Sequence, residues 1–266
     1  MRKKRVVIAI AAISIAAIAL LAWFAVASSP REPVYHGKSL SQLAADVGKN
    51  PAPFQEAVRA AGTNAVPVLL RFLQAHDSML KIRLLELAVK QPLFKVHFVD
   101  DYTWQEAGAL GFGALTNRAA FAVPELLRIF ELKISSHSQQ SVADSLGSIG
   151  PDARMAVPTL LRETGGSDPY VQRSAFAALA DIHADPDAVV PVLIKGLQNR
   201  YWVIQYNSAE GLGNFGPAAK SAVPALVGLI KTSVPGTQSA IPEVRQAALE
   251  ALKKIDPAAA EKLSAN

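Results

Sequence analysis

Apolar residues recur at spacings of three and four along most of the chain from residue 54 onward, with polar residues between them. This spacing predicts amphipathic helices that each bury one face. Several of these helices begin with valine and proline, which fits because the first helical turn needs no N–H from proline. The pairs are Val66–Pro67, Val123–Pro124, Val157–Pro158, Val190–Pro191 and Val223–Pro224.

The Val-Pro pairs are periodic. After a longer first interval, the last four prolines, at positions 124, 158, 191 and 224, follow one another at nearly equal steps. A second marker, a large apolar residue twelve positions before a proline, keeps the same phase. It is occupied by Phe112, Leu146, Leu179 and Leu212. Two markers in register define an internal repeat with a period of roughly 33 residues.

Each repeat is interpreted as a helical hairpin. Helix A begins at Val-Pro, and helix B follows, with small and aliphatic residues at helical spacing. The predicted ends of the B helices are Gly150, His183, Gly216 and Asp256. A single hairpin cannot bury its own apolar stripe, whereas stacked copies form a continuous core. Alanine and glycine on helix B predict close packing between neighbouring helices.

The repeats resemble a known family. The pattern A-V-P-x-L followed by "EVRQAALEALKKIDPAA" at 243–259 resembles the HEAT-like repeats of bacterial α-solenoids, over roughly residues 54–260. The resemblance implies an all-α fold, an α-solenoid of about five to six HEAT-like hairpins within residues 54–266. "YHGKSLSQL" at 35–43 is similar to the lead-in of some membrane-anchored members, so residues 30–53 are expected to form a linker and lead-in helix.

Residues 1–29 differ from the repeats. "MRKKR" precedes Val6 to Ala27, an apolar run that reaches about 33 Å as a helix, enough to span a bilayer. A cleaved signal peptide is the alternative, because Ala25-Val26-Ala27 resembles a cleavage site. With the basic flank inside, the repeats are expected on the exported side of an inner membrane, either anchored or free in the periplasm after cleavage near Ala27.

The net charge of +5 depends on that basic flank. Four of the 27 lysines and arginines lie in residues 2–5, so the remaining chain has 23 basic against 22 acidic residues. Nucleic-acid binders normally carry a strong basic face, so no nucleic-acid partner is expected. The chain has no cysteine, which excludes disulfides and thiolate metal sites.

Two short motifs are weak candidates for chemistry. "GLGNFG" at 211–216 satisfies G-x-G-x-x-G, but a dinucleotide loop follows a strand and opens a helix, whereas this motif closes one. "HFVDD" at 97–101 offers one imidazole and two carboxylates, a combination more typical of a solvated loop than of a metal site. We therefore expect no catalytic residue, no cofactor and no metal.

One stretch departs from the repeat pattern. In "NRYWVIQYN", 199–207, Trp202 takes the place of Pro169 and Pro242, and Tyr206 takes that of Arg173. Trp202 and Tyr206 are four residues apart and share a helix face. One interpretation packs Trp202 under the adjacent helix. The other is a partner-binding surface, because tryptophan, tyrosine and arginine carry much interface energy. Its members are Arg200, Tyr201, Trp202, Gln205 and Tyr206.

Two classes of function remain open. The first is a non-enzymatic scaffold, tethered to the membrane, that presents its repeats to another protein of unknown identity on the exported side. The alternative is an accessory protein that binds a small-molecule or polymeric ligand or assists cofactor attachment, as the resemblance also allows. The sequence favours the scaffold, because no nucleophile motif or phosphate loop is evident.

Overall fold

The computed structural model describes residues 32–77, 99–232 and 241–264. Contacts divide the chain into residues Met1–Glu32 and Pro33–Asn266, and the second unit is described below. The predicted apolar segment, Val6 to Ala27, lies outside the described residues. Among the helices that are described, none combines the length and apolar character needed to cross a bilayer.

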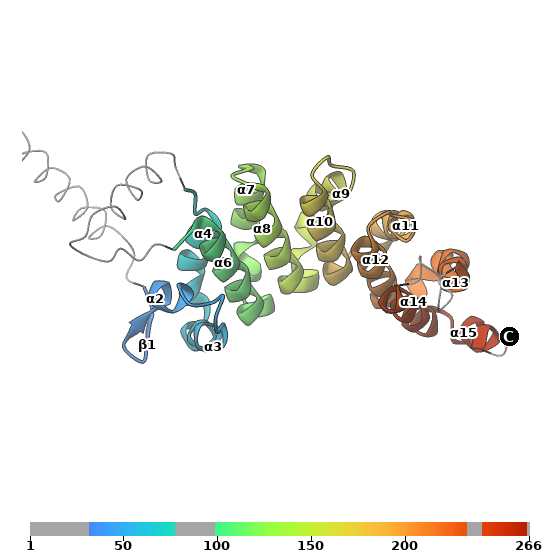
Figure 1. Ribbon diagram of the computed structural model, residues 1–266, viewed down its shortest axis with the longest axis horizontal. Helices are drawn as coiled ribbons and strands as arrows, with labels where there is room; N and C mark the ends of the chain where they lie inside the picture. Colours follow the sequence, from blue (N-terminus) through green and yellow to red (C-terminus); the bar gives the residue numbers. More distant parts are fainter. Residues whose placement is uncertain (1–31, 78–98, 233–240, 265–266) are drawn as a thin grey trace, which may run out of the picture. The chain divides into compact units, whose positions relative to one another are not determined.

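Within the described residues, successive A and B helices form five hairpins, and each hairpin packs against the next (Figure 1). The A helices are α4 (Val66–Leu73), α7 (Val123–Glu131), α9 (Val157–Glu163), α11 (Pro186–Gly196) and α13 (Val223–Thr232). The B helices are α6 (Asp101–Leu115), α8 (Ser136–Ile149), α10 (Pro169–Ile182), α12 (Trp202–Phe215) and α14 (Pro242–Ile255). This arrangement confirms the predicted all-α array of helical hairpins.

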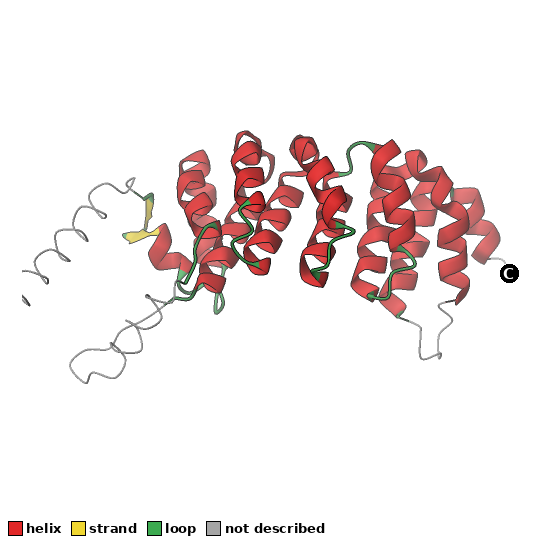
Figure 2. Ribbon diagram, turned by 90° about the horizontal axis from the view of Figure 1, so that it is seen from above, coloured by secondary structure: helices red, strands yellow, loops and turns green. Residues whose placement is uncertain are grey.

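Shorter elements connect and flank the hairpins, and one strand pair accompanies the helices (Figure 2). Most B helices continue into a 3₁₀ segment before the next A helix. These segments are η1 (Gly62–Ala65), which follows α3 (Ala52–Ala61), then η2 (Thr116–Ala122), η3 (Gly150–Ala156) and η4 (Gly216–Ala222). Helix α15 (Pro257–Ser264) packs on α14.

The B helices end where the sequence predicts. Gly150, His183, Gly216 and Asp256 are the C-caps of α8, α10, α12 and α14. Gly150 and Gly216 have φ values of 76° and 54°, which glycine adopts without steric cost. The motif at 211–216 therefore closes a helix, as predicted, and does not open one.

The expected helix start at Val190–Pro191 is wrong. Helix α11 begins at Pro186, and Pro191 lies inside it. The reason is local, because Asp185–Pro186 restarts a helix directly after the left-handed His183, so residues 186–190 are already helical. Pro191 then has no N–H to donate to the carbonyl of Asp187.

The lead-in contains a hairpin that the sequence analysis did not foresee. Strands β1 (Val34–Tyr35) and β2 (Lys38–Ser39) pair antiparallel, with Tyr35 opposite Lys38. His36 and Gly37 form the two-residue turn, and both have positive φ, as tight hairpins require. Ser39 then caps the short helix α2 (Leu40–Ala44), so the expected lead-in helix is present but brief.

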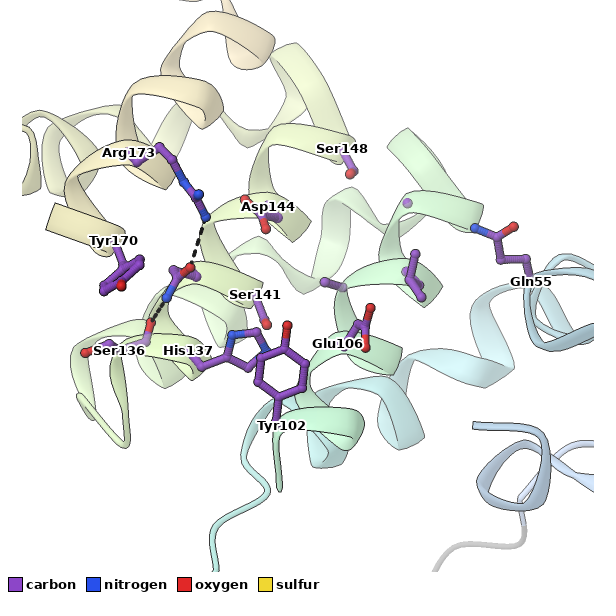
Figure 3. Close-up of a pocket in the computed structure, with 14 residues that line it drawn as sticks. Gln55, Tyr102, Glu106, Ser136, His137, Ser141, Asp144, Ser148, Tyr170 and Arg173 are labelled. Carbon is purple, nitrogen blue, oxygen red and sulfur yellow. Dashed lines mark hydrogen bonds between the residues drawn. The ribbon is translucent and has the colours of Figure 1, made fainter. Parts of the chain in front are cut away.

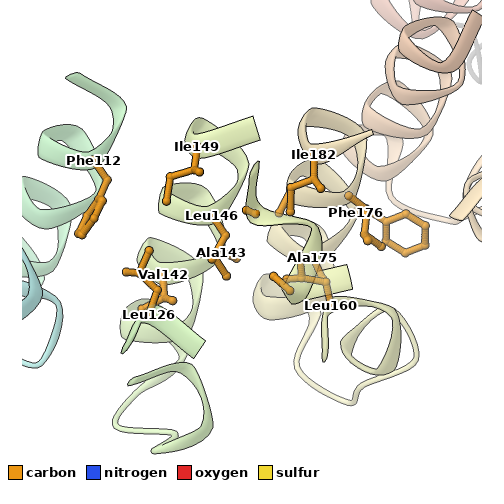
Figure 4. Packing of buried hydrophobic residues seen from close by; sticks show 14 of the residues in the cluster. Phe112, Leu126, Val142, Ala143, Leu146, Ile149, Leu160, Ala175, Phe176 and Ile182 are labelled. Carbon is orange, nitrogen blue, oxygen red and sulfur yellow. The ribbon is translucent and has the colours of Figure 1, made fainter. Parts of the chain in front are cut away.

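The core lies between the A and B layers (Figure 4). Contacts between successive B helices are more extensive than contacts between successive A helices. The four residues of the second repeat marker are fully buried at these contacts: Phe112, Leu146, Leu179 and Leu212. The marker is therefore periodic because each repeat needs one large apolar residue at the same core position.

Glycine allows the close approach of neighbouring B helices. A Cβ on Gly211 of α12 would lie 2.6 Å from Ala180 Cβ of α10. A Cβ on Gly213 would lie 3.0 Å from Ala251 Cα of α14. Both positions confirm the predicted close packing, which brings the exposed sides of adjacent B helices near one another.

Candidate functional site

A groove of about 900 Å³ crosses the outer surface of α6, α8 and α10 (Figure 3). Its lining includes Tyr102, Glu106, His137, Asp144, Tyr170 and Arg173. A smaller pocket of about 290 Å³ lies between α12 and α14. Both hollows are formed by B helices.

Equivalent positions of the B helices line these hollows. One position recurs in the B helices, as the fifth residue of α8, α10, α12 and α14. It is occupied by Glu106 in α6, Gln140 in α8, Arg173 in α10, Tyr206 in α12 and Gln246 in α14. The ninth residues of α8, α12 and α14 are Asp144, Glu210 and Glu250. Residues four apart share one helix face. We call the surface formed by these positions, by Asp181 one turn beyond the ninth residue of α10, and by the exposed first turns of the B helices the B-face.

Capping residues position the aromatic side chains of the first turns. Asp100 accepts a hydrogen bond from Thr103 N (2.8 Å) at the start of α6, next to Tyr102. Asp168 accepts one from Tyr170 N (2.9 Å) at the start of α10. Tyr102 is 55% exposed and Tyr170 60% exposed, so both rings present apolar surface to solvent.

Tyr102 also stacks on His137 of the next B helix. The two ring centroids are 3.9 Å apart, and the planes differ by 14°. Burial lowers the pKa of His137, although the carboxylates of Glu106, Asp101 and Asp100 and the backbone of Tyr102 oppose this shift. The stack joins α6 to α8 at one edge of the groove.

Asp144 lies further along the groove. Its carboxyl reaches solvent, but the helices on either side exclude much of the surrounding water, and this desolvation raises its pKa to about 6. The charge of Arg173 and a hydrogen bond with Ser174 act in the opposite direction, and repulsion by Asp181 adds to the increase. Arg173 Nη2 also donates to Gln140 Oε1 (3.3 Å), which links α10 to α8.

Further carboxylates continue along the B-face. Desolvation and repulsion by Glu210 raise the pKa of Asp181. The charge of Glu210 raises the pKa of Tyr206, and burial and the charge of Glu250 add to this increase. Negative charge on α10, α12 and α14 is therefore close enough to interact from helix to helix.

The structure brings the sequence-predicted cluster only partly together. Arg200 Nη2 donates to Tyr201 Oη (2.7 Å), and its guanidinium lies 4.6 Å from the centre of the Tyr201 ring. Trp202 is the first residue of α12 and is 46% exposed, so the interpretation that packs it under a neighbouring helix is not supported. Tyr206 instead packs partly against the core and faces α14.

Gln205 has a different role from its predicted neighbours. Its amide donates to Asn199 O (2.7 Å) in the turn before α12. The same repeat position holds Gln105, Gln139 and Gln172. Each of these amides donates to a carbonyl at or just beyond the end of the preceding A helix: Ala75, Phe130 and Thr164. The hydrogen bond of Gln205 therefore stabilises the hairpin turn.

The sequence analysis missed the groove residues Tyr102, His137, Asp144 and Arg173. A signal existed, because one repeat period separates each of Glu106, Gln140, Arg173 and Tyr206 from the next. The glutamines at 139, 172 and 205 are spaced by the same period. Aligning the B helices by this period separates the positions that hold the hairpins together from those that face solvent.

No cluster of three or more histidine, aspartate or glutamate side chains with metal-binding geometry is present among the described residues. Of the weak motif at 97–101, His97 and Phe98 lie outside the described residues. Asp100 serves as the N-cap of α6.

Comparison with known proteins agrees with the repeat pattern. Residues 157–241, which include α9 to α13, match the family described as HEAT repeats. HEAT repeats generally serve as scaffolds for protein interactions and are typically non-enzymatic. The crystal structure of an engineered protein is similar to this chain at 21% identity, covering 82% of this chain and 96% of its own, with a TM-score of 0.42. No curated protein matches.

Proposed function

We propose that this protein is a non-enzymatic interaction scaffold whose partner protein docks on the B-face. The observation that carries this proposal is the groove of about 900 Å³, with Tyr102, Tyr170 and Arg173 at its surface. Tyrosine and arginine are enriched among the residues that dominate interface energy. A partner that covers the exposed rings would remove apolar surface from water, which favours association.

Trp202 extends this surface beyond the groove. It lies on the first turn of α12, at the repeat position of the first residue of α10. Trp202 and Tyr170 are thus exposed aromatic residues in the first turns of successive B helices. Arg200 and Tyr201 lie directly before it and hold each other by a hydrogen bond and a cation–π contact. We include these three residues in the proposed interface.

The partner test compares exposed residues at two ends of the hairpins. Tyr170→Ala or Trp202→Ala should weaken the affinity of the full chain for a captured partner by about tenfold or more. Met155→Ala is the control, because Met155 is 63% exposed but lies on η3, after the C-terminal end of a B helix. If Met155→Ala weakens the complex and the two aromatic variants do not, the partner docks elsewhere and the proposal is wrong.

We further propose that residues 6–27 tether the repeats to a membrane, with the repeats on the exported side. The support is the basic flank followed by an apolar run of spanning length. A C-terminal alkaline phosphatase fusion should then be active, and the N-terminus should remain on a membrane-bound protein. An inactive fusion contradicts export, whereas a soluble protein that begins near Ser28 contradicts the tether but not export.

A further inference from the structure

The charges of the B-face differ from those of the A helices. On the A helices and the loops that follow them, carboxylates form ion pairs: Glu125 with Arg128 (2.7 Å), Glu131 with Arg162 (2.6 Å) and Glu163 with Lys133 (3.8 Å). On the B-face, Asp144, Asp181, Glu210 and Glu250 form no ion pair with another described residue. These carboxylates therefore lack the close ion pairs that their counterparts on the A helices form.

These four carboxylates are distributed one to a helix. Asp144 is on α8, Asp181 on α10, Glu210 on α12 and Glu250 on α14. Two cations face the same hollows, Arg173 and Lys254. Burial raises the pKa values of Asp144 and Asp181, and repulsion by a neighbouring carboxylate adds to each increase. A cationic partner would relieve this repulsion along the whole row.

The spacing of the row restricts the shape of that partner. Packed helices are separated by about 8 to 10 Å, and the glycine contacts place these B helices toward the close end of that range. An extended polyproline II segment rises about 3.1 Å per residue and has three residues per turn, so it advances about 9 Å per turn. Every third residue of such a segment would therefore meet one B helix.

We propose that the B-face binds an extended segment of a partner protein that carries lysine or arginine at every third position. This inference rests on the proposed scaffold function and names the chemistry of its partner. The basic side chains pair with the carboxylates on successive B helices. Charge complementarity selects the partner, and the helix spacing selects its register.

The test uses three labelled twelve-residue peptides and the full chain in a non-ionic detergent, with binding measured by fluorescence anisotropy. One peptide has lysine at positions 1, 4, 7 and 10, the second has the same composition with adjacent lysines, and the third has glutamate in place of lysine. The periodic lysine peptide should bind at least about fivefold more tightly than the second peptide, and its affinity should fall as salt increases.

Variants locate the binding surface. A triple variant should bind the periodic lysine peptide about tenfold more weakly, since each exposed ion pair contributes modestly. It combines Asp144→Asn, Glu210→Gln and Glu250→Gln. The matched control combines Glu131→Gln and Glu163→Gln, which removes carboxylates from the A-helix side and should change the affinity less than about twofold. Glu210→Gln alone, together with a thermal melt of each variant, separates lost binding from lost folding.

The outcomes separate this inference from the proposed function. Equal affinity for the two lysine peptides overturns the register, and equal loss in the A-side control overturns the location. Binding of the glutamate peptide alone, or of none of the three, overturns the basic-partner inference. When only the glutamate peptide binds, or none does, the variants Tyr170→Ala and Trp202→Ala decide about the scaffold function. The scaffold function stands if these variants release the captured partner, and it fails if they do not.

Discussion

The side-chain amide of Gln172 donates to the backbone carbonyl of Thr164, with 2.7 Å between Nε2 and O. Thr164 is the C-cap of helix α9, so its carbonyl lies beyond the last turn of that helix. Helices leave such carbonyls without an internal partner. One residue at a repeated position therefore connects the end of each of several A helices to the B helix that follows.

Replacing Gln172 with methionine should destabilise the protein by about 1 kcal/mol, because the partly buried Thr164 carbonyl loses its donor while the side-chain volume is kept. Gln140→Met is the control, since both hydrogen bonds of the Gln140 amide, to Ser136 O and from Arg173 Nη2, lie at the surface. Urea unfolding monitored by circular dichroism measures both. Equal midpoints for Gln172→Met and the wild type would contradict the proposed role of the repeated glutamine.

Asp144→Asn should increase the stability of the protein at pH 8. The pKa of Asp144 is about 6 in the folded protein, against an ordinary value of 3.8. At a pH between these two pKa values, the folded protein keeps a proton that the unfolded chain has lost. Stability therefore falls as pH rises through this range. Arg173 and Asp181 face the carboxyl and stay unchanged in the variant.

The wild-type and Asp144→Asn melting curves should converge at pH 4, where the wild-type carboxyl is protonated. Glu56→Gln, on an exposed position of α3, is the control for removal of one negative charge. A variant that is less stable than the wild type at pH 8 would show that Asp144 is stabilised in its charged form, contrary to the desolvation that the packed helices impose.

Gly211→Ala should destabilise the protein by about 1 to 3 kcal/mol, because the added methyl group would overlap Ala180 on the neighbouring helix. Gly228→Ala in α13 is the opposite case. No atom lies within 4 Å of its added Cβ, so alanine should stabilise the helix by about 0.5 to 1 kcal/mol. Unfolding midpoints that move in the same direction for both variants would contradict the close packing of α10 and α12.

Trp202→Ala should have a small effect on folding, because the ring is 46% exposed. Phe112→Ala provides the contrast, since a fully buried aromatic residue costs about 3 to 5 kcal/mol when it is reduced to alanine. Measured per folded molecule, Trp202→Ala should weaken the affinity for a captured partner more than Phe112→Ala does. If Trp202→Ala unfolds the protein as readily as Phe112→Ala, Trp202 belongs to the core.

The helical hairpins could be predicted from the sequence because their signals are local. Val-Pro marks most A-helix starts, and Gly150 and Gly216 end B helices with positive φ. Pro191 shows the limit of that approach. The same Val-Pro pair lies inside α11 because Asp185–Pro186, a short way earlier, already starts the helix. The two-residue hairpin at His36–Gly37 carried a recognisable turn signal that was not used.

The candidate site was less accessible to sequence analysis, because it is made by exposed positions on different repeats. Trp202 was found because it departs from its sister repeats, and the structure leaves it exposed. Gln205 was selected for its position near Trp202, but its amide bonds to a backbone carbonyl. Asp144 gave no individual signal, because its raised pKa depends on helices that pack beside it.

Site-specific photo-cross-linking can show whether the partner contacts the B-face. A photoreactive residue would replace Gln140, on the B-face, or Lys195, an exposed residue of the A helix α11, in the full chain. We expect a cross-linked partner from position 140 that disappears with Tyr170→Ala, and none from position 195. The same partner cross-linked from position 195 but not from position 140 would contradict it.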